Sequence, residues 1–215
     1  MYYDLHTHRV LPVLPDVTAF YNVIVGRNVL PLPAEKCPVS CGIHPWHIQA
    51  DAWEKQLDEF RRLAGNEQVV MIGEAGLDKK AFAPFELQIR VFEEQIRFSE
   101  EQGKPLVIHC VGAWNELVAR RKKWNPSQPW ILHGFRKKGE LAAQLRALGF
   151  YFSFGAYFHE TAAREAWPDR LLAETDESDR SVQEIYQRIA SALQLPVAEL
   201  VRQIEKTVGK LGVLK

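Results

Sequence analysis

Short apolar runs alternate with longer amphipathic segments along most of the chain. The runs are rich in valine, isoleucine, phenylalanine and tyrosine, which is typical of strands in a buried parallel sheet. Eight runs of this kind occur, at residues 2–6, 19–25, 39–43, 69–72, 105–108, 130–132, 150–154 and 171–173.

Between most of these runs, apolar residues recur at the spacing of one face of a helix. The first such face is followed by Gly65, a typical helix end. The faces consist of Trp53, Leu57, Phe60 and Ala64; Phe85, Ile89, Phe92 and Ile96; Leu141, Leu145 and Leu148; and Val182, Ile185, Ile189 and Leu193. Regular alternation of strands and helices predicts a parallel sheet.

Eight strands with helices between them predict an α/β fold, a (β/α)8 TIM-type barrel, formed as one domain over residues 1–215. The chain is short for this fold, which usually takes ~250 residues. Residues 9–18 and 26–38 are too few or too rich in proline for full helices. We therefore expect the first one or two helices to be shortened or missing, which leaves a thinly covered flank where a second subunit would pack. An open, doubly wound sheet is the alternative.

Composition narrows the class of protein. Hydrophobic residues make up 47% of the chain and charged residues 25%, as in globular proteins. No apolar stretch approaches the ~20 residues of a membrane span, and the N-terminus lacks the features of a signal peptide. The three cysteines are an odd number, which favours reduced thiols. We expect a cytoplasmic protein with no membrane contact and, at zero net charge, no overall attraction to DNA.

Residues that commonly bind metals follow several of the apolar runs. His6 and His8 are two positions apart, so both project to the same face of a strand. Other such residues end the fourth, fifth, sixth and eighth runs: Glu74, His109, His133 and Asp176. Because the carboxyl ends of barrel strands meet at one face, we expect these residues to form a hydrolytic metal site.

Glu74 is placed to bridge two divalent ions in this prediction. His6 and His8 would complete the first site, and His109 and His133 the second. Zinc is the expected ion, with magnesium, manganese, iron or nickel as alternatives.

Asp176 is expected to bind an ion and to accept the proton of the attacking water. Glu74 and Asp176 are thus the predicted catalytic carboxylates. Asp4 and Glu174 are interpreted as residues that support the ligands rather than bind the ion.

Several short blocks occur in the order found in one known family. They are Asp4-x-His6-x-His8, Gly42-Ile43-His44-Pro45, Gly73-Glu74-Ala75-Gly76-Leu77-Asp78, Ile108-His109-Cys110, Leu132-His133-Gly134-Phe135 and Glu174-Thr175-Asp176. As a set they resemble the signature blocks of the TatD-like metal-dependent hydrolases of the amidohydrolase superfamily. The resemblance implies a TIM-type barrel, the same metal ligands, His44 as a residue lining the site, and hydrolysis of phosphodiesters, often in DNA.

The chain departs from that family after two of the ligands. Val111 and Gly112 follow the fifth-strand His-Cys pair in a segment where the family usually has Arg-Asp. Glu177, Ser178 and Asp179 stand where the family usually continues with Pro-Tyr-Leu. We expect the metal site to be kept and the handling of the substrate to differ.

A basic segment, Arg136, Lys137 and Lys138, is expected to open a helix, where positive charge opposes the helix dipole. A bound phosphate would remove this conflict, so Arg136 and Lys137, with His44, are predicted to contact the substrate and form a local basic patch for DNA. A solvated basic loop is the simpler alternative. Three tryptophans after strands, Trp46, Trp114 and Trp167, suit base stacking, although burial is the commoner role.

The predicted function is metal-dependent hydrolysis of an ester bond, with a phosphodiester as the favoured substrate. Hydrolysis of a small amide, lactone or phosphotriester would use the same barrel and ions and is an alternative. A non-catalytic interaction module that keeps a metal for stability is a further alternative.

Overall fold

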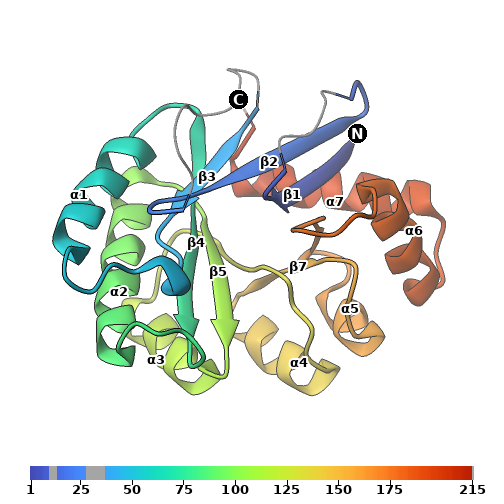
Figure 1. Cartoon of the computed structure of the whole chain (residues 1–215). Helices are drawn as coiled ribbons and strands as arrows, with labels where there is room; N and C mark the ends of the chain where they lie inside the picture. Colours follow the sequence, from blue (N-terminus) through green and yellow to red (C-terminus); the bar gives the residue numbers. More distant parts are fainter. Residues whose placement is uncertain (10–13, 28–36, 215) are drawn as a thin grey trace. The chain divides into compact units, whose positions relative to one another are not determined.

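The computed structural model describes residues 1–9, 14–27 and 37–214, in which strands alternate with helices from the third strand to the eighth (Figure 1). The strands are β1 (Tyr2–Thr7), β2 (Val17–Ile24), β3 (Val39–Gly42), β4 (Val69–Asp78), β5 (Leu106–Val111), β6 (Trp130–Leu132), β7 (Tyr151–Phe154) and β8 (Leu171–Ala173). The helices are the 3-10 helix η1 (Pro45–His47), α1 (Trp53–Ala64), α2 (Phe85–Gln102), α3 (Trp114–Trp124), α4 (Gly139–Ala147), α5 (Glu160–Ala166), α6 (Val182–Leu193) and α7 (Val197–Leu211).

The strands form one sheet in the order β1 to β8, and the pairings are parallel. The segment after β8 returns to β1. There the Asp176 N–H donates to the His6 carbonyl at 2.8 Å, and the His8 N–H donates to the Asp176 carbonyl at 3.3 Å. Sequential order with β1 beside the end of β8 is the topology of a (β/α)8 TIM-type barrel, so the predicted fold class is confirmed.

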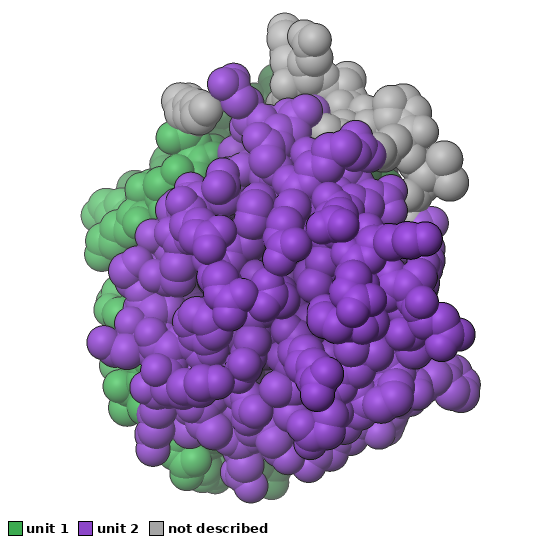
Figure 2. Space-filling view, turned by 90° about the vertical axis from the view of Figure 1, so that its left-hand side faces the viewer, with its two compact units in different colours: residues 1–21, 131–215 green, residues 22–130 purple. Residues whose placement is uncertain are grey.

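The chain divides into two compact units, coloured separately in Figure 2. Unit 1 consists of Met1–Tyr21 and Ile131–Lys215, and unit 2 of Asn22–Trp130. The chain passes from one unit to the other within β2 and again within β6. The single domain expected over residues 1–215 stays a prediction.

Unit 2 has a core between its helices and the strands β3 to β5. Helices α1 and α2 turn their apolar stripes inward, and Phe60 and Phe92 are almost completely buried. The Phe60 and Phe98 rings meet edge to face at 5.1 Å. Each such ring contributes roughly 1.5–3 kcal/mol through burial, which holds β4 and β5 in place for the side chains at their ends.

Unit 1 has its own core, in which α6 and α7 pack against β1 and β8. The Tyr186 hydroxyl accepts from the Tyr3 N–H and donates to the Tyr3 carbonyl, both at 3.1 Å, and so ties α6 to β1. Helix α6 begins with a capping box between Ser181 and Glu184, which satisfies N–H groups that a helix start leaves unpaired.

Two details concern the predicted helices. Among the described residues of the β1–β2 and β2–β3 loops there is no helix, as expected, while residues 10–13 and 28–36 lie outside the described part. The expectation that Arg136 to Lys138 open a helix was wrong, because these residues precede α4, which begins at Gly139. Within the described chain no helix combines the length and apolar character needed to cross a membrane.

Candidate metal centre

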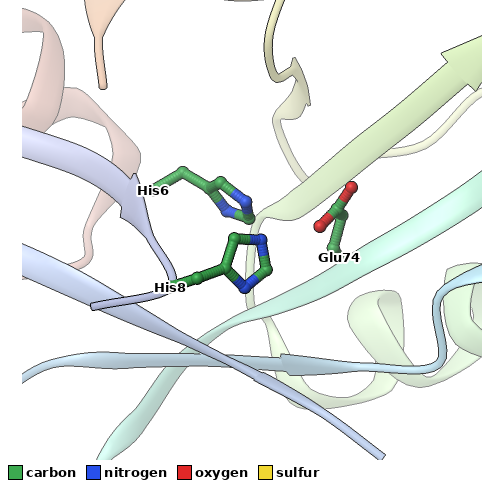
Figure 3. A group of neighbouring side chains, drawn as sticks. All are labelled: His6, His8 and Glu74. Carbon is green, nitrogen blue, oxygen red and sulfur yellow. The ribbon is translucent and has the colours of Figure 1, made fainter. Parts of the chain in front are cut away.

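The end of β1 carries two of the predicted ligands. Figure 3 shows His6 and His8 extending from this strand, with Glu74 drawn on β4. The two imidazole rings meet edge to face, with centroids 5.0 Å apart. His6 is completely buried, and the His8 side chain is only 11% exposed. Buried imidazoles at the end of a strand are costly unless they serve a bound group or a polar network.

His133 and Asp176 join these histidines within unit 1. The His6 and His133 ring centroids lie 4.5 Å apart, and Asp176 Oδ1 lies 3.6 Å from His8 Nε2. Ligand atoms of His6, His133 and Asp176 all lie within 4.8 Å of one another. We call His6, His8, His133 and Asp176 the unit 1 cluster. Asp176 has a left-handed backbone, φ 55°, which a non-glycine residue adopts at a cost of order 1 kcal/mol.

A buried carboxylate orients one member of this cluster. Glu174 is completely buried, and its Oε1 accepts the Gly134 N–H at 2.7 Å and lies 3.4 Å from His133 Nδ1. A histidine held at Nδ1 by a carboxylate presents Nε2 to an ion. This contact supports the interpretation of Glu174 as a residue that holds His133.

Asp4 acts on the backbone that carries Asp176. Its two oxygens accept from the Thr175 N–H at 2.8 Å and the Thr175 hydroxyl at 2.6 Å. The pKa of Asp4 is raised to about 7, mainly by burial; the Thr175 hydrogen bonds oppose the rise and the nearby Glu174 charge adds to it. Asp4 therefore joins β1 to the turn that presents Asp176.

A second cluster lies wholly in unit 2, with Glu74 between two histidines. Glu74 Oε1 lies 3.2 Å from His44 Nε2 and 3.1 Å from His109 Nδ1. All three residues offer ligand atoms within 4.8 Å of one another. We call His44, Glu74 and His109 the unit 2 cluster. His44 was expected from the sequence to line the site, but its position beside Glu74 was not predicted.

Polar residues of β2 and β3 hold Glu74. The Asn22 side-chain amide donates to Glu74 Oε2 at 3.4 Å, and its oxygen accepts the Glu74 N–H at 3.0 Å. Ser40 donates to the same Asn22 oxygen at 2.9 Å. Neither residue was predicted from the sequence, although each interrupts an apolar run, which is the signal that could have found it.

Asp78 holds His109 and was also given no role from the sequence. Its Oδ2 lies 2.9 Å from His109 Nε2 and accepts the Trp46 indole N–H at 2.7 Å. Burial alone would raise the pKa of Asp78, but hydrogen bonds from His109, the Lys80 N–H and Trp46 hold it below its ordinary value. A charged Asp78 accepts the proton of His109 Nε2, which leaves Nδ1 to face Glu74.

A glycine brings the strands of unit 2 close enough for this contact. Gly76 pairs with His109 across β4 and β5 and has φ 144°. A Cβ at Gly76 would lie 2.0 Å from the His109 carbonyl oxygen. Only glycine fits this backbone and this spacing.

A cavity of about 600 Å³ lies beside Asp176 in unit 1. Its lining includes Arg136, Tyr157 and the residues that depart from the family pattern, Glu177, Ser178 and Asp179. The Arg136 guanidinium lies over the Tyr157 ring, 5.7 Å from its centroid. Lys137 is exposed and is not among the lining residues.

Both clusters have the chemistry that divalent ions require. Imidazole nitrogens with carboxylate oxygens suit zinc, manganese and iron. In unit 2, with the proton of His109 on Nε2, two acceptor atoms, His109 Nδ1 and Glu74 Oε1, face each other at 3.1 Å. A cation relieves the repulsion between two such acceptors. The residues therefore fit a metal, and each predicted ligand belongs to one of the two clusters, while the assignment of ligands to individual ions stays a prediction.

Comparison with known proteins identifies similar chains. The sequence profile of a family described as TatD related DNase matches residues 33–211. An uncharacterized metal-dependent hydrolase of Buchnera aphidicola is 32% identical over 80% of this chain and 66% of its own length. A Dickeya dadantii protein named 3'-5' ssDNA/RNA exonuclease TatD is 31% identical over 78% of this chain and 68% of its own length.

A solved structure supports the fold. YJJV, a TatD homologue from Escherichia coli K12, matches 98% of this chain and 97% of its own with a TM-score of 0.82 at 19% sequence identity. At this identity the likeness concerns the fold alone. The chain spans about half to two thirds of the length of the curated relatives it matches, since Escherichia coli YcfH, 36% identical over 64% of this chain, is covered to 54%.

Proposed function

Because the chain belongs to the family of TatD-related DNases, we propose that it hydrolyses phosphodiester bonds with the help of divalent metal ions. The observation that carries the proposal is the pair of histidine and carboxylate clusters, each with a buried carboxylate behind one of its histidines. Metal sites commonly combine histidine ligands with carboxylates that hold those histidines from behind. Polar networks that only stabilise a fold rarely have both sets of residues.

A divalent ion in such a cluster would stabilise negative charge on the phosphate, and it would lower the pKa of a bound water to about 7. His6, His8, His133 and Asp176 would hold one ion, and Glu74 with His109 would hold another. This grouping differs from the sequence prediction, which placed His133 with His109. Asp176 is the residue that accepts the proton of the attacking water, since it is a quarter exposed beside the cavity while the other carboxylate of the clusters, Glu74, is buried. Glu174 and Asp78 keep His133 and His109 in the orientation that binding requires.

His44 has a different role in this proposal. Its Nδ1 accepts the Trp46 backbone N–H at 3.1 Å, so neutral His44 carries its proton on Nε2. A protonated nitrogen cannot bind an ion but can donate a hydrogen bond, to Glu74 Oε1 at 3.2 Å in this structure and to a phosphate oxygen when substrate is bound. We therefore assign His44 to the substrate, as the sequence predicted, rather than to the metal.

Single-stranded nucleic acid is the substrate class that fits best. Relatives from Cronobacter sakazakii and Dickeya dadantii carry the name 3'-5' ssDNA/RNA exonuclease TatD. In this chain Arg136 supplies a positive charge at the cavity beside Asp176, where a phosphate of the strand would lie.

The acidic lining of that cavity favours a second candidate. Glu177, Asp179 and Glu184 line it together with Asp176, and their charges oppose a polyanion. Hydrolysis of a small uncharged ester, such as a lactone or a phosphotriester, would avoid this repulsion.

A panel of substrates separates the two candidates. Single-stranded DNA, single-stranded RNA, duplex DNA, a lactone and a phosphotriester would be incubated with the protein in chelator and after addition of zinc, manganese or magnesium. We expect metal-dependent cleavage of single strands. Metal-dependent turnover of the lactone or triester, with no cleavage of nucleic acid, would replace the first candidate by the second.

A further inference from the structure

Trp46 stands apart from the other tryptophans of the chain. All six lie in the described residues, and Trp46 alone is exposed, at 59%. Trp114 and Trp167, the other two considered for stacking, are half-buried. An exposed tryptophan ring does not contribute the free energy that its burial would add to folding, which makes a functional role for Trp46 worth testing.

The Trp46 ring is exposed, but a hydrogen bond fixes its position at one edge. The indole N–H donates to Asp78 Oδ2 at 2.7 Å, and the Trp46 backbone N–H donates to His44 Nδ1 at 3.1 Å. The indole and His44 rings meet at 72°, with centroids 6.1 Å apart. Trp46 thus contacts His44, a member of the unit 2 cluster, and Asp78, which holds His109 of the same cluster.

A ring with a held edge and an open face is suited to stack a planar ligand. Its orientation is set before binding, so little conformational entropy is lost when a base lies on it. Stacking on an aromatic side chain is worth about 1–3 kcal/mol per base and tolerates any sequence. Lys80 is exposed on the loop after β4 and donates its backbone N–H to Asp78, the carboxylate that also accepts the Trp46 indole N–H. Its positive charge is available to a phosphate.

We propose that the face of Trp46 is the stacking site for one base of a single-stranded nucleic acid, and that its indole N–H positions His109 through Asp78. The proposal rests on the proposed function and deepens it, because it gives the unit 2 cluster a contact with the base as well as with the phosphate.

The two parts of the proposal predict different kinetic effects. Trp46→Phe keeps a ring but loses the N–H, so kcat should fall while KM changes less than about twofold. Trp46→Ala loses both, so KM should rise by about 5- to 100-fold as well. Asp78→Asn should lower kcat as Trp46→Phe does, and the double variant should lose little more, because both act on His109. A purely structural role would not separate kcat from KM.

Binding without turnover tests the stacking site directly. A fluorescent oligothymidylate and an abasic strand of the same length would be titrated with metal-free protein in chelator, and fluorescence anisotropy would give both affinities. We expect wild type and Trp46→Phe to prefer the strand with bases, and Trp46→Ala to lose that preference by about 5- to 100-fold. Phe82→Leu is the matched control, because Phe82 is fully exposed on the neighbouring loop.

The outcomes distinguish this proposal from the proposed function. An unchanged preference in Trp46→Ala, the same loss in Phe82→Leu, or no preference in wild type overturns the stacking site, even when wild type cleaves single strands. A preference that depends on Trp46, without cleavage of any phosphodiester, supports the stacking site and overturns the nuclease.

Discussion

The two clusters offer similar metal-ligand side chains, histidines and a carboxylate, but are built differently. In unit 1, His6, His8 and His133 surround a single carboxylate, Asp176, at the edge of a cavity of about 600 Å³. In unit 2, Glu74 is buried between two histidines and held by Asn22. In the proposed function the clusters therefore have different roles: the unit 1 cluster acts on the reacting water, and the unit 2 cluster supplies a fixed charge and, through Trp46, a base contact.

Loss of either central carboxylate is the most severe test of this division. Asp176→Asn and Glu74→Gln should each lower kcat/KM on single-stranded DNA by roughly 10³-fold or more, because each removes several kcal/mol of transition-state stabilisation. Initial rates measure the loss, and circular dichroism checks the fold. Asp51→Asn, a change of an exposed carboxylate, serves as the control. Near-normal activity in either variant would remove that cluster from the mechanism.

The buried carboxylates Asp4 and Asp78 should respond to pH with opposite signs. The folded protein holds the proton of Asp4 more tightly than the unfolded chain, since burial raises its pKa from 3.8 to about 7. Its contribution to stability is present below pH 4 and is lost as the pH rises to about 7, a difference of roughly 4 kcal/mol. The pKa of Asp78 is lowered, so its contribution is present at neutral pH and is lost as the pH falls below its ordinary value.

Urea unfolding of metal-free protein between pH 3 and pH 8 measures this contrast. Relative to wild type, Asp4→Asn should gain stability toward neutral pH, and Asp78→Asn should lose it there. Parallel curves for wild type and Asp4→Asn would show that Asp4 keeps an ordinary pKa.

Alanine substitutions at two glycines, one crowded and one with open space around it, test the close approach of β4 and β5. Gly76→Ala should destabilise the protein by about 3 kcal/mol or more, because the new Cβ would meet the His109 carbonyl at 2.0 Å. Gly209→Ala, in α7 with nothing within 4 Å of its Cβ position, should instead stabilise it by about 1 kcal/mol. Thermal unfolding gives both signs, and equal effects would refute the steric argument.

The residues that hold the histidines should have the smallest effects. Glu174→Gln and Asp78→Asn should each lower the affinity of one ion by about 10- to 100-fold. Titration against a competing chelator measures affinity and stoichiometry together. Each variant should weaken the binding of one ion and leave that of the other unchanged. Equal weakening of every bound ion by both variants would contradict the assignment of one ion to each cluster.

The sequence was sufficient for the fold and for most cluster residues, because strand ends in a barrel meet at one face. It also pointed to Asp4 and Glu174, which lie two residues from His6 and Asp176 along the chain. The residues that hold the ligands of unit 2 are far from them along the sequence: Asn22 is 52 residues from Glu74, and Asp78 is 31 from His109. Such pairs are set by tertiary packing, so an interrupted apolar run can single out Asn22 but does not identify its partner.

The central claim is that divalent ions held by these clusters cleave a phosphodiester. Its most direct measurement is the rate of single-stranded DNA cleavage by protein treated with chelator and then supplied with one metal at a time, beside Asp176→Asn under the same conditions. The account predicts no cleavage in chelator, recovery in wild type with at least one divalent ion, and none in Asp176→Asn. Cleavage that persists in chelator, or equal recovery in the variant, would contradict it.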